Sequence, residues 1–489
     1  MDEYQSSIDY LYAQINYERI GTTAYNVNNF RLDRMRRLME LIGNPQDDYR
    51  IIHVAGTKGK GTVCHLLSSI LLHAGYRCGL YTSPHLLRLE ERFQAGNHGD
   101  FRSPTKAEMV ELIGTIRKAT ETYQASNSTA TRPTFFEQTT AMAFLHFARR
   151  QCEAVVLEVG LGGRLDSTNI CSPELTVVTS ISLDHQKQLG DTVAEIAAEK
   201  AGIIKPGIPV VNAADAADAI AVVQNRAAEL ESPCFQISRD LVWQWSPISN
   251  SHTSHHFASA VEGEGPDSML LSISPAHPQA DVTLRFAQSE GGEETECLGL
   301  QTSLLGRHQA PNVAAAVASI RILQQREWVI PDAALKQGVL SAQPPARLQC
   351  VGESPTQVID TAHNPYSIQA GLDALNTHFP GVPIVSLFAS SKDKDFRTML
   401  QLLLQFSDSV ILTEYLKNPR AASVHDLRES VETLPVDGPE LISCQNPDAA
   451  YCNALNVASS IGGLVYVAGS FFLAAEVLPL VQPDLGKAD

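Results

Sequence analysis

The segment Ala55–Thr62, with the sequence AGTKGKGT, combines residue types and spacing that point directly to chemistry. Its glycines allow the backbone to approach a ligand closely, so that N–H groups can cradle phosphate oxygens. The segment follows an apolar run and opens a helical pattern, which is the context in which a glycine-rich loop binds phosphate. The helix dipole and Lys60 would add positive charge at the β- and γ-phosphates, and Thr62 offers a hydroxyl beside them.

The spacing departs from the GxxxxGK[ST] pattern of common phosphate loops, because Gly61 separates Lys60 from Thr62. The alternative interpretation is a tight strand–helix turn that carries surface lysines. The strand-to-helix context favours the phosphate loop.

Three residues at the ends of apolar runs could hold the Mg²⁺ that phosphoryl transfer requires. Ser83 follows CGLYT, Glu158 lies in AVVLEV and His185 follows LTVVTS. Open α/β sheets place their sites at such strand ends. Taken singly, a serine there is usually a turn residue and a histidine is usually a hydrogen-bonded structural residue. Glu158 is the stronger candidate, because a carboxylate in an apolar strand is costly unless it is paired or bound to metal.

Lys200 lies in the helical pattern of residues 191–205, DTVAEIAAEKAGIIK, which Thr192 and Glu195 open as a capping box. Lys200 shares an apolar stripe with Val193, Ile196 and Ala197 at helical spacing, so it is expected to project towards protein. Burial lowers the pKa of a lysine, and its neutral amine could then react even with CO₂. A lysine that extends along the protein surface to reach solvent is an equally good interpretation of the periodicity.

Apolar runs that alternate with helical patterns predict the elements that position these side chains. Continuous Val, Ile and Leu runs indicate a mostly parallel sheet that is covered on both faces. A helix over Gly61–His73 follows the first run. The expected strands are Arg50–Ala55, Cys78–Thr82, Ala154–Val159, Leu175–Ser180 and Pro209–Asn212.

The pattern changes after about residue 240. Alternating segments within about 240–300 predict a small antiparallel β region, and a helix is expected over Asn312–Gln325. Gln343–Ala346, which contains two prolines, is typical of a linker. We therefore expect a first domain over 1–342 and a smaller, Rossmann-like α/β domain over 343–489. The strands of the second domain are predicted at Gln357–Asp360, Ile384–Phe388, Val410–Thr413 and Leu464–Ala468.

Composition excludes several classes of protein. The net charge of −17 argues against binding to a nucleic-acid backbone. The nine cysteines form no CxxC pair, which is typical of a reducing compartment without a zinc site. The N-terminus lacks the pattern of a secretory signal, and the uncharged stretch Ala449–Ala475 is interpreted as helix, turn and buried strand instead of a membrane span. A cytoplasmic protein is expected.

A set of motifs in a fixed order resembles the folate branch of the Mur ligase superfamily, whose bacterial members are bifunctional dihydrofolate synthases and folylpolyglutamate synthases. The motifs are GTKGKGT, YTSPHL, LEVGLGGRLDSTN, SLDHQKQLGDT, IAAEKAGIIK, GRHQAPN, PPARLQ and DTAHNP, and they run through nearly the whole chain. The resemblance implies that 1–342 is an ATP-binding central domain and 343–489 a glutamate ligase domain. It also implies that ATP activates the carboxylate of a pteroate or folate as an acyl phosphate, which the amine of L-glutamate then attacks.

The resemblance also assigns roles to residues. Arg347, Asp360 and His363 would contact the nucleotide from the second domain, so that the site closes between the two domains. Lys200 would be carbamylated and would help bind a second Mg²⁺, and a monovalent cation is a further expected cofactor. The implied catalytic residues are Lys60, Glu158, His185 and Lys200; the implied metal ligands are Ser83, Glu158, His185 and Lys200; the implied ATP contacts are Gly56, Thr57, Lys58, Gly59, Lys60, Gly61, Thr62, Asn312, Arg347, Asp360 and His363.

The pterin side is implied by two further segments. Phe136 could pack on a flat ring and Glu137 could hydrogen-bond to it, although an FFE run is equally typical of a helix start with core aromatics. The segment Asn29–Leu32 departs from the usual string of the first pterin loop. The implied pterin contacts are Thr134, Phe136, Glu137, Leu165, Asp166 and Ser167.

The predicted partners are L-glutamate, dihydropteroate and reduced folates, with no nucleic acid and no membrane, and a monomer is expected. One alternative is a Mur ligase that acts on a peptidoglycan precursor, but such ligases usually carry an extra N-terminal domain, and about 50 residues precede the phosphate loop here. Another is a nucleotide-binding regulatory protein without ligase chemistry, which would not need Lys200, His185 or a second domain.

Overall fold

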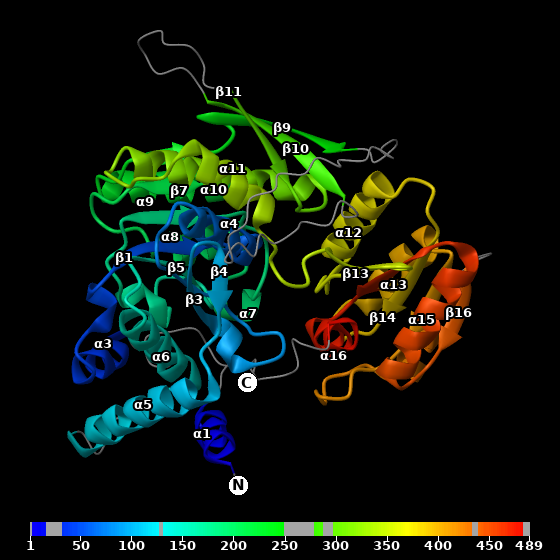
Figure 1. Cartoon of the computed structure of the whole chain (residues 1–489), viewed down its shortest axis with the longest axis horizontal. Helices are drawn as coiled ribbons and strands as arrows, with labels where there is room; N and C mark the ends of the chain where they lie inside the picture. Colours follow the sequence, from blue (N-terminus) through cyan, green and yellow to red (C-terminus); the bar gives the residue numbers. More distant parts are fainter. Residues whose placement is uncertain are drawn as a thin grey trace, which may run out of the picture.

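The computed structural model describes residues 2–15, 32–126, 131–248, 278–286, 297–432 and 439–482. Asn29–Arg31 and most of the His- and Ser-rich stretch at 244–265 lie outside the described residues. Figure 1 shows a large sheet, a small sheet above it and a third sheet at the right of the view.

The large sheet has eight strands in the order β4-β3-β2-β5-β1-β6-β7-β8. The six strands from β2 to β8 pair in parallel, and β3 and β4 are added at one edge as antiparallel strands. All five strands expected from the sequence of this region are confirmed, with their ends shifted by two residues at most. The strands are β1 (Arg50–Ala55), β2 (Cys78–Tyr81), β3 (Phe93–Asn97), β4 (Asp100–Arg102), β5 (Ala154–Glu158), β6 (Leu175–Val178), β7 (Val210–Asn212) and β8 (Cys234–Gln236).

Both faces of this sheet are covered, because alternate residues of its strands enter different cores. Ile52 and Val54 of β1 pack into one core, and Ile51 packs into the other. The first core is covered by α4 (Lys60–His73), α10 (Ala310–Gln324) and α11 (Asp332–Ser341). The second is covered by α1 (Glu3–Tyr12), α3 (Leu32–Leu41), α5 (Lys106–Ser126) and α6 (Phe135–Arg149). The edge near β7 is covered by α8 (Val193–Ala201) and α9 (Ala217–Glu229).

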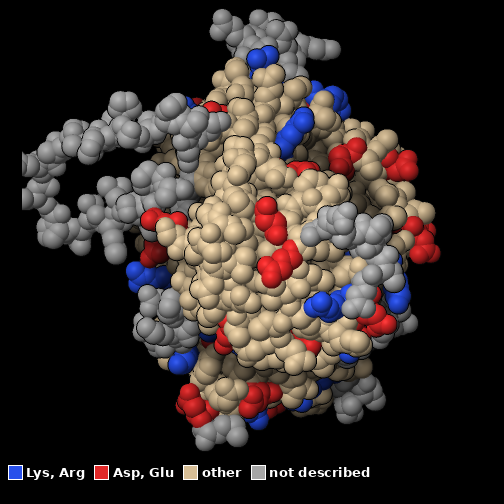
Figure 2. Space-filling view, turned by 90° about the vertical axis from the view of Figure 1, so that its right-hand side faces the viewer, with Lys and Arg blue, Asp and Glu red and all other residues tan. Residues whose placement is uncertain are grey.

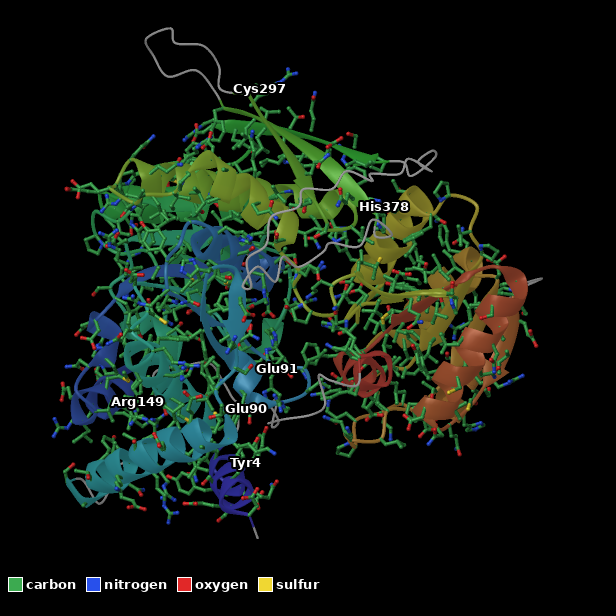
Figure 3. All side chains as sticks on the ribbon, viewed as in Figure 1. Tyr4, Glu90, Glu91, Arg149, Cys297 and His378 are labelled. Atoms are coloured by element: carbon green, nitrogen blue, oxygen red, sulfur yellow. The ribbon has the colours of Figure 1, made fainter. Side chains whose placement is uncertain are left out.

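The expected antiparallel region is confirmed as a three-stranded sheet of β9 (Leu241–Ile248), β10 (Gln279–Phe286) and β11 (Cys297–Thr302). Buried and exposed residues alternate along β11, as expected for a sheet with one covered face. Trp245 of β9 meets the ring of His378 edge-on, and the Gly306 N–H donates to His378 Nε2 at 3.3 Å. His378 ends α12 (Pro365–His378), and Figure 3 shows it below the small sheet.

The remaining sheet has the order β12-β13-β17-β14-β15-β16, in which only β12 is antiparallel to its neighbour. Helices α12, α13 and α14 cover one face, and α15 and α16 cover the other. The four strands predicted for this region are confirmed. The strands are β12 (Gln349–Glu353), β13 (Thr356–Ile359), β14 (Ile384–Phe388), β15 (Ser409–Leu412), β16 (Glu440–Ser443) and β17 (Leu464–Ala468); the helices are α12 (Pro365–His378), α13 (Phe396–Phe406), α14 (Val424–Glu432), α15 (Pro447–Ile461) and α16 (Phe471–Val481).

The stretch Ala449–Ala475 forms a helix, a turn and a buried strand, as predicted. Within the described ranges, no helix has both the length and the apolar character needed to cross a membrane. The sheets change between β11, which ends at Thr302, and β12, which begins at Gln349. The exact domain boundary at 342/343 stays a prediction.

The face in Figure 2 shows acidic and basic side chains scattered over an otherwise uncharged surface. Among the described residues on this face, no continuous basic patch is visible. The expectation, drawn from the net charge of −17, that the chain does not bind a nucleic-acid backbone stays a prediction.

A buried ion pair ties α3 to the start of α6. Arg34 Nε lies 2.7 Å from Glu137 Oε2, and Arg34 Nη1 donates to Thr131 Oγ1 at 2.8 Å. The same carboxylate accepts the Thr134 N–H at 2.7 Å, which completes a capping box. A surface pair on the same helix, Arg37 with Glu40, has both side chains 51% exposed and offers a matched comparison.

Arg34→Met should lower the free energy of unfolding by about 3–5 kcal/mol, because it leaves the Glu137 carboxylate buried without its cation. Arg37→Met should change it by about 0–1 kcal/mol, because that pair is exposed to solvent. Urea unfolding of both variants beside the parent chain measures the difference. Equal effects of the two substitutions would show that the buried pair contributes no special stability.

Candidate active site

The phosphate loop occupies the turn between β1 and α4, at the carboxyl end of the central strand. Gly56 and Gly59 have positive φ angles of 151° and 86°. A Cβ at Gly56 would lie 1.8 Å from Thr179 Oγ1, so a side chain has no room there. The Thr57 N–H donates to the Ser180 carbonyl at 2.8 Å, which anchors the loop to the segment after β6. The local structure matches the predicted strand–loop–helix unit.

Lys60 is the first residue of α4, and its Nζ lies 3.4 Å from the Thr57 carbonyl oxygen. A pocket opens beside it. The pocket brings Lys60 together with Lys200 and His185, which the sequence places far apart. The residues that line it are Gly56, Thr57, Lys60, Val159, Gly160, Leu161, Gly162, Asp184, His185, Leu189 and Lys200.

Lys200 projects from α8 into this pocket and is only 4% exposed. Its Nζ donates to the Gly56 carbonyl at 2.8 Å. Burial, followed by the nearby charge of Lys60, lowers the pKa of Lys200 to about 7. Of the two interpretations that the periodicity left open, the inward orientation is confirmed, and the amine is half neutral near pH 7.

Glu158 ends β5, and its buried carboxylate faces the start of α4, where a Cβ on Gly61 would lie 3.6 Å from Oε2. Burial raises the pKa of Glu158, while the charge of Lys60 and the N–H of Ser83 oppose that shift. The Ser83 N–H donates to Glu158 Oε2 at 3.2 Å. Two of the predicted metal ligands are therefore neighbours.

His185 lines the pocket, in a left-handed conformation with φ 48° just before α7 (Gln186–Leu189). Its side chain is 57% exposed. No group of three or more His, Cys, Asp or Glu side chains that could hold a metal occurs within the described ranges. The predicted ligand set contains only two such side chains, Glu158 and His185, so the metal assignment stays a prediction.

Asn312 of α10 lies against the phosphate loop. A Cβ on Gly59 would meet Asn312 Oδ1 at 2.2 Å, and Asn312 Nδ2 donates to Gln309 Oε1 at 2.7 Å. The space that a Cβ on Gly59 would take is thus filled by the side-chain amide of Asn312, a residue that the resemblance implies contacts ATP. Lys58 contacts helix α12, where its Nζ lies 4.0 Å from the centroid of the Tyr366 ring.

Of three predicted nucleotide contacts, Arg347 lies just before β12, and Asp360 and His363 lie in the loop between β13 and α12. Burial raises the pKa of Asp360 to about 6, against the opposing charge of Arg347. Tyr466 Oη donates to Asp360 Oδ2 at 3.3 Å, and His363 Nδ1 donates to the Thr361 carbonyl at 2.9 Å. The charge of Arg347 also acts on Glu158. Arg347 therefore connects the two sheets electrostatically.

The predicted pterin residues divide into two groups. Phe136 is half-buried, and its ring packs so closely on Gly160 that a Cβ there would lie 2.4 Å away. Thr134 and Glu137 form a capping box with each other, and Glu137 also binds Arg34, as described above. Their polar atoms are thus engaged by the protein itself, which is the helix-start interpretation of the FFE run.

The second pterin segment is similarly occupied. Leu165, Asp166 and Ser167 are all buried. Asp166 accepts the N–H groups of Gly160 and Leu161 and caps the short helix η3 (Ser167–Ile170). Its carboxylate therefore serves the backbone, and a direct contact with a pterin stays a prediction.

The site also contains residues that were not predicted from the sequence, among them Asp184 and Tyr366. Asp184 lines the pocket, and its charge raises the pKa of Lys200 against the lowering effects of burial and of Lys60. Asp184 directly precedes His185 in SLDHQ, and this adjacency could have marked it as a site residue. Tyr366, by contrast, meets Lys58 only through the packing of two distant segments, which no local pattern reveals.

Comparisons with known proteins agree with this geometry. Residues 102–320 match the family described as Mur ligase middle domain, and residues 346–471 match that of Mur ligase, glutamate ligase domain. A dihydrofolate synthase/folylpolyglutamate synthase from Bacillus subtilis is 33% identical over 403 residues, which cover 82% of this chain and 84% of the relative.

Solved structures share the complete fold. The Mycobacterium tuberculosis folylpolyglutamate synthase complexed with ADP superposes with a TM-score of 0.77 at 27% identity and covers 98% of this chain and 99% of its own. A folylpolyglutamate synthase complex with AMPPCP and folate gives a TM-score of 0.70 at 27% identity, with 97% and 98% covered. The predicted α/β fold and the resemblance are confirmed, and the chain belongs to the dihydrofolate synthase/folylpolyglutamate synthase branch of the Mur ligases, a family of ATP-dependent amide ligases.

Proposed function

We propose that this protein uses ATP to join L-glutamate to the carboxylate of dihydropteroate, of a reduced folate, or of both. One observation carries the proposal: the buried amine of Lys200 donates to the Gly56 carbonyl of the phosphate loop, in the same pocket as Lys60. A purely structural turn has no use for two lysines at this place, since burying a cation is costly and Asp184, the one carboxylate among the described residues of the pocket lining, does not balance two cations. A nucleotide polyphosphate supplies the remaining counter-charge.

The nucleotide is proposed to lie along the phosphate loop, with its phosphates at residues Gly56–Thr62 and its base near Asn312. Backbone N–H groups and the N-terminus of α4 stabilise the phosphates, and Lys60 neutralises charge that develops during phosphoryl transfer. Arg347, Asp360 and His363 complete the site from the second sheet. The similarity to complexes that contain ADP or AMPPCP supports this assignment.

Mg²⁺ fits the chemistry of the donors on one side of the pocket. Glu158 is a buried carboxylate and Ser83 lies beside it with a hydroxyl group. Mg²⁺ needs only one or two carboxylates, because waters and nucleotide phosphates complete its coordination. We propose that Ser83 and Glu158 hold one ion and that His185 and Lys200 contribute to a second. When bound, Mg²⁺ neutralises charge on the phosphates and orients them for transfer.

Lys200 is proposed to act as a carbamate. Its neutral amine attacks CO₂, so that an N–C bond forms and a proton is released. The side chain changes from a cation to an anion, which removes the repulsion from Lys60 and creates an oxygen ligand for a metal ion. The pKa of about 7 and the position of Lys200 inside the pocket support this assignment.

The reaction follows from these positions. An oxygen of the substrate carboxylate attacks the γ-phosphorus, and ADP leaves. The amine of L-glutamate then attacks the acyl phosphate, so that an amide forms and inorganic phosphate departs. Phe136, which packs on the wall of the pocket at Gly160, offers a face for the pterin ring. The similarity to a folate complex supports this substrate class.

Other parts of the proposal concern the state of the protein. We propose that it acts as a monomer in the cytoplasm. None of the nine cysteines forms a disulfide, which suits a reducing compartment. A peptidoglycan-precursor ligase is less favoured, because the relatives are dihydrofolate and folylpolyglutamate synthases. A non-catalytic regulatory protein is less favoured, because it would not need both Lys60 and Lys200 in the pocket.

ADP formation should require L-glutamate together with either dihydropteroate or tetrahydrofolate. Without L-glutamate the acyl phosphate has no acceptor, and without the pterin substrate it cannot form. Omission of either substrate should therefore reduce ADP release to background. Separate assays with the two pterin substrates tell which of the two folate activities is present. ADP release that is indifferent to both substrates would contradict the proposed function.

Lys200→Ala should reduce kcat on the order of 100-fold or more, as expected when a group that organises transition-state charge is lost. Lys187→Ala, on the exposed face of α7, serves as the control and should keep near-normal turnover. Near-normal turnover of Lys200→Ala would rule out the carbamate role.

Carbamylation should also depend on pH. Since the folded pKa of Lys200 is about 7, the neutral amine that reacts with CO₂ is abundant above that pH and is lost as the pH falls below it. ¹³C NMR after equilibration with ¹³CO₂ should show a carbamate signal that weakens in that direction and is absent from the Lys200→Ala variant.

A further inference from the structure

A chain of buried polar groups runs from the interior of β1 to the wall of the pocket. His53 of β1 is fully buried, and its Nε2 lies 2.8 Å from Thr168 Oγ1. Thr168 Oγ1 lies 2.6 Å from Asp166 Oδ1, and Cys171 Sγ lies 3.7 Å from His53 Nδ1. None of these side chains has a place in the proposed reaction steps, yet burying them requires that each find a partner.

The donors and acceptors allow one direction of hydrogen bonding along this chain. The Asp166 carboxylate accepts N–H groups from Gly160, Leu161 and Thr168 and the hydroxyl of Thr168. Four donors are satisfied best by an ionised carboxylate. The single hydroxyl proton of Thr168 is therefore committed to Asp166, so its oxygen is left to accept from His53.

This direction specifies the tautomer of His53. Burial lowers the pKa of His53 to about 3, so the ring is neutral and carries one proton. That proton must lie on Nε2 to reach the Thr168 hydroxyl. Nδ1 is then an acceptor for the thiol of Cys171. The groups form a directed relay, defined here as Cys171, His53, Thr168 and Asp166.

The far end of the relay holds one turn of the pocket wall. Asp166 Oδ2 accepts the Gly160 and Leu161 N–H groups at 3.1 Å and 3.0 Å. Both residues line the pocket, and the ring of Phe136 packs on the other side of Gly160. The turn is thus fixed between a carboxylate and an aromatic ring. A shift of the turn would move the surface on which Phe136 rests.

The phosphate loop is anchored by a different set of contacts. The Thr57 N–H donates to the Ser180 carbonyl at 2.8 Å, and Thr179 Oγ1 donates to the Lys58 carbonyl at 2.7 Å. Neither contact involves the relay, although His53 lies on the strand that leads into the loop. Loss of the relay should therefore affect the turn more than the loop.

We propose that His53 and Thr168 are positioning residues that act through Asp166 to fix the Gly160–Leu161 turn, and so shape the seat of the pterin ring beside Phe136. The inference rests on the proposed function for the identity of the ring. It also gives Asp166 a role through the backbone in place of a direct contact with the pterin. The relay should influence binding of the pterin substrate and leave binding of ATP nearly unchanged.

Thr168→Val and Thr168→Ser test this role by kinetics. Valine keeps the shape but removes the hydroxyl, so KM for the pterin substrate should rise about tenfold while KM for ATP stays within about twofold. Serine restores the hydroxyl and should restore KM. Three outcomes would overturn the proposal: equal changes in both KM values, no change in either, or a serine variant that does not restore KM. Each of them would mean that Thr168 has a merely structural role or none.

His53→Gln and His53→Leu form a second matched pair. The side-chain amide of glutamine can offer an N–H at about the reach of Nε2, so this variant should keep a KM for the pterin substrate within a few-fold of the parent. Leucine cannot donate and should behave as Thr168→Val does. A glutamine variant as impaired as the leucine variant would contradict the donor role of His53.

The tautomer of His53 can be measured without any assay of activity. In ¹⁵N-histidine-labelled protein, with the signal assigned by its loss in His53→Gln, the ring should be neutral and protonated at Nε2 between pH 6 and 8. A proton on Nδ1, or titration near an ordinary histidine pKa, would overturn the relay. Since this readout needs no substrate, failure of the relay and failure of the proposed ligase function give different results.

Discussion

Two lysine amines, those of Lys60 and Lys200, are held in one pocket at the phosphate loop, and much of the structure serves to keep them there. Lys200 is buried, and the charge of Lys60 lowers its pKa further. The Asp184 carboxylate offsets only part of this repulsion, so the arrangement favours a further anion. In this structure the loop carbonyls accept hydrogen bonds from the two amines, Gly56 from Lys200 and Thr57 from Lys60. A polyphosphate, and a carbamate on Lys200, would turn this repulsion into attraction.

The fold meets this constraint by bringing distant segments to the carboxyl end of β1. That strand lies between β5 and β6 in the sheet, so Glu158 and the Thr179–Ser180 segment flank the loop. The helix α8 contributes Lys200 from the same edge, and α10 contributes Asn312. The second sheet adds Arg347, whose charge reaches both Glu158 and Asp360. Charged side chains from two α/β units therefore act on one another at the carboxyl end of β1, which is where parallel α/β folds usually place their sites.

Local patterns were enough to predict what depends on neighbours along the chain. Apolar runs predicted nine strands of the two larger sheets, and helical periodicity placed Lys200 on the apolar stripe of α8, because both depend on which side of an element meets the core. Periodicity could not predict the roles of Glu137 and Asp166. Whether a carboxylate binds a ligand or a group of its own protein depends on which groups lie near it in the fold. The partner of Glu137 is Arg34, which lies 103 residues away in the sequence. Tyr366 was missed for the same reason, since its contact with Lys58 joins separate sheets.

The central claim is that this pocket activates a carboxylate by moving a phosphoryl group onto it. The most direct test uses a pterin substrate whose reacting carboxylate carries ¹⁸O, together with ATP and L-glutamate. One carboxylate oxygen becomes the bridge to phosphorus in the acyl phosphate, so it should leave with the phosphate when the amide forms. The account predicts one ¹⁸O atom in the released inorganic phosphate, and amide formation with unlabelled phosphate would contradict it.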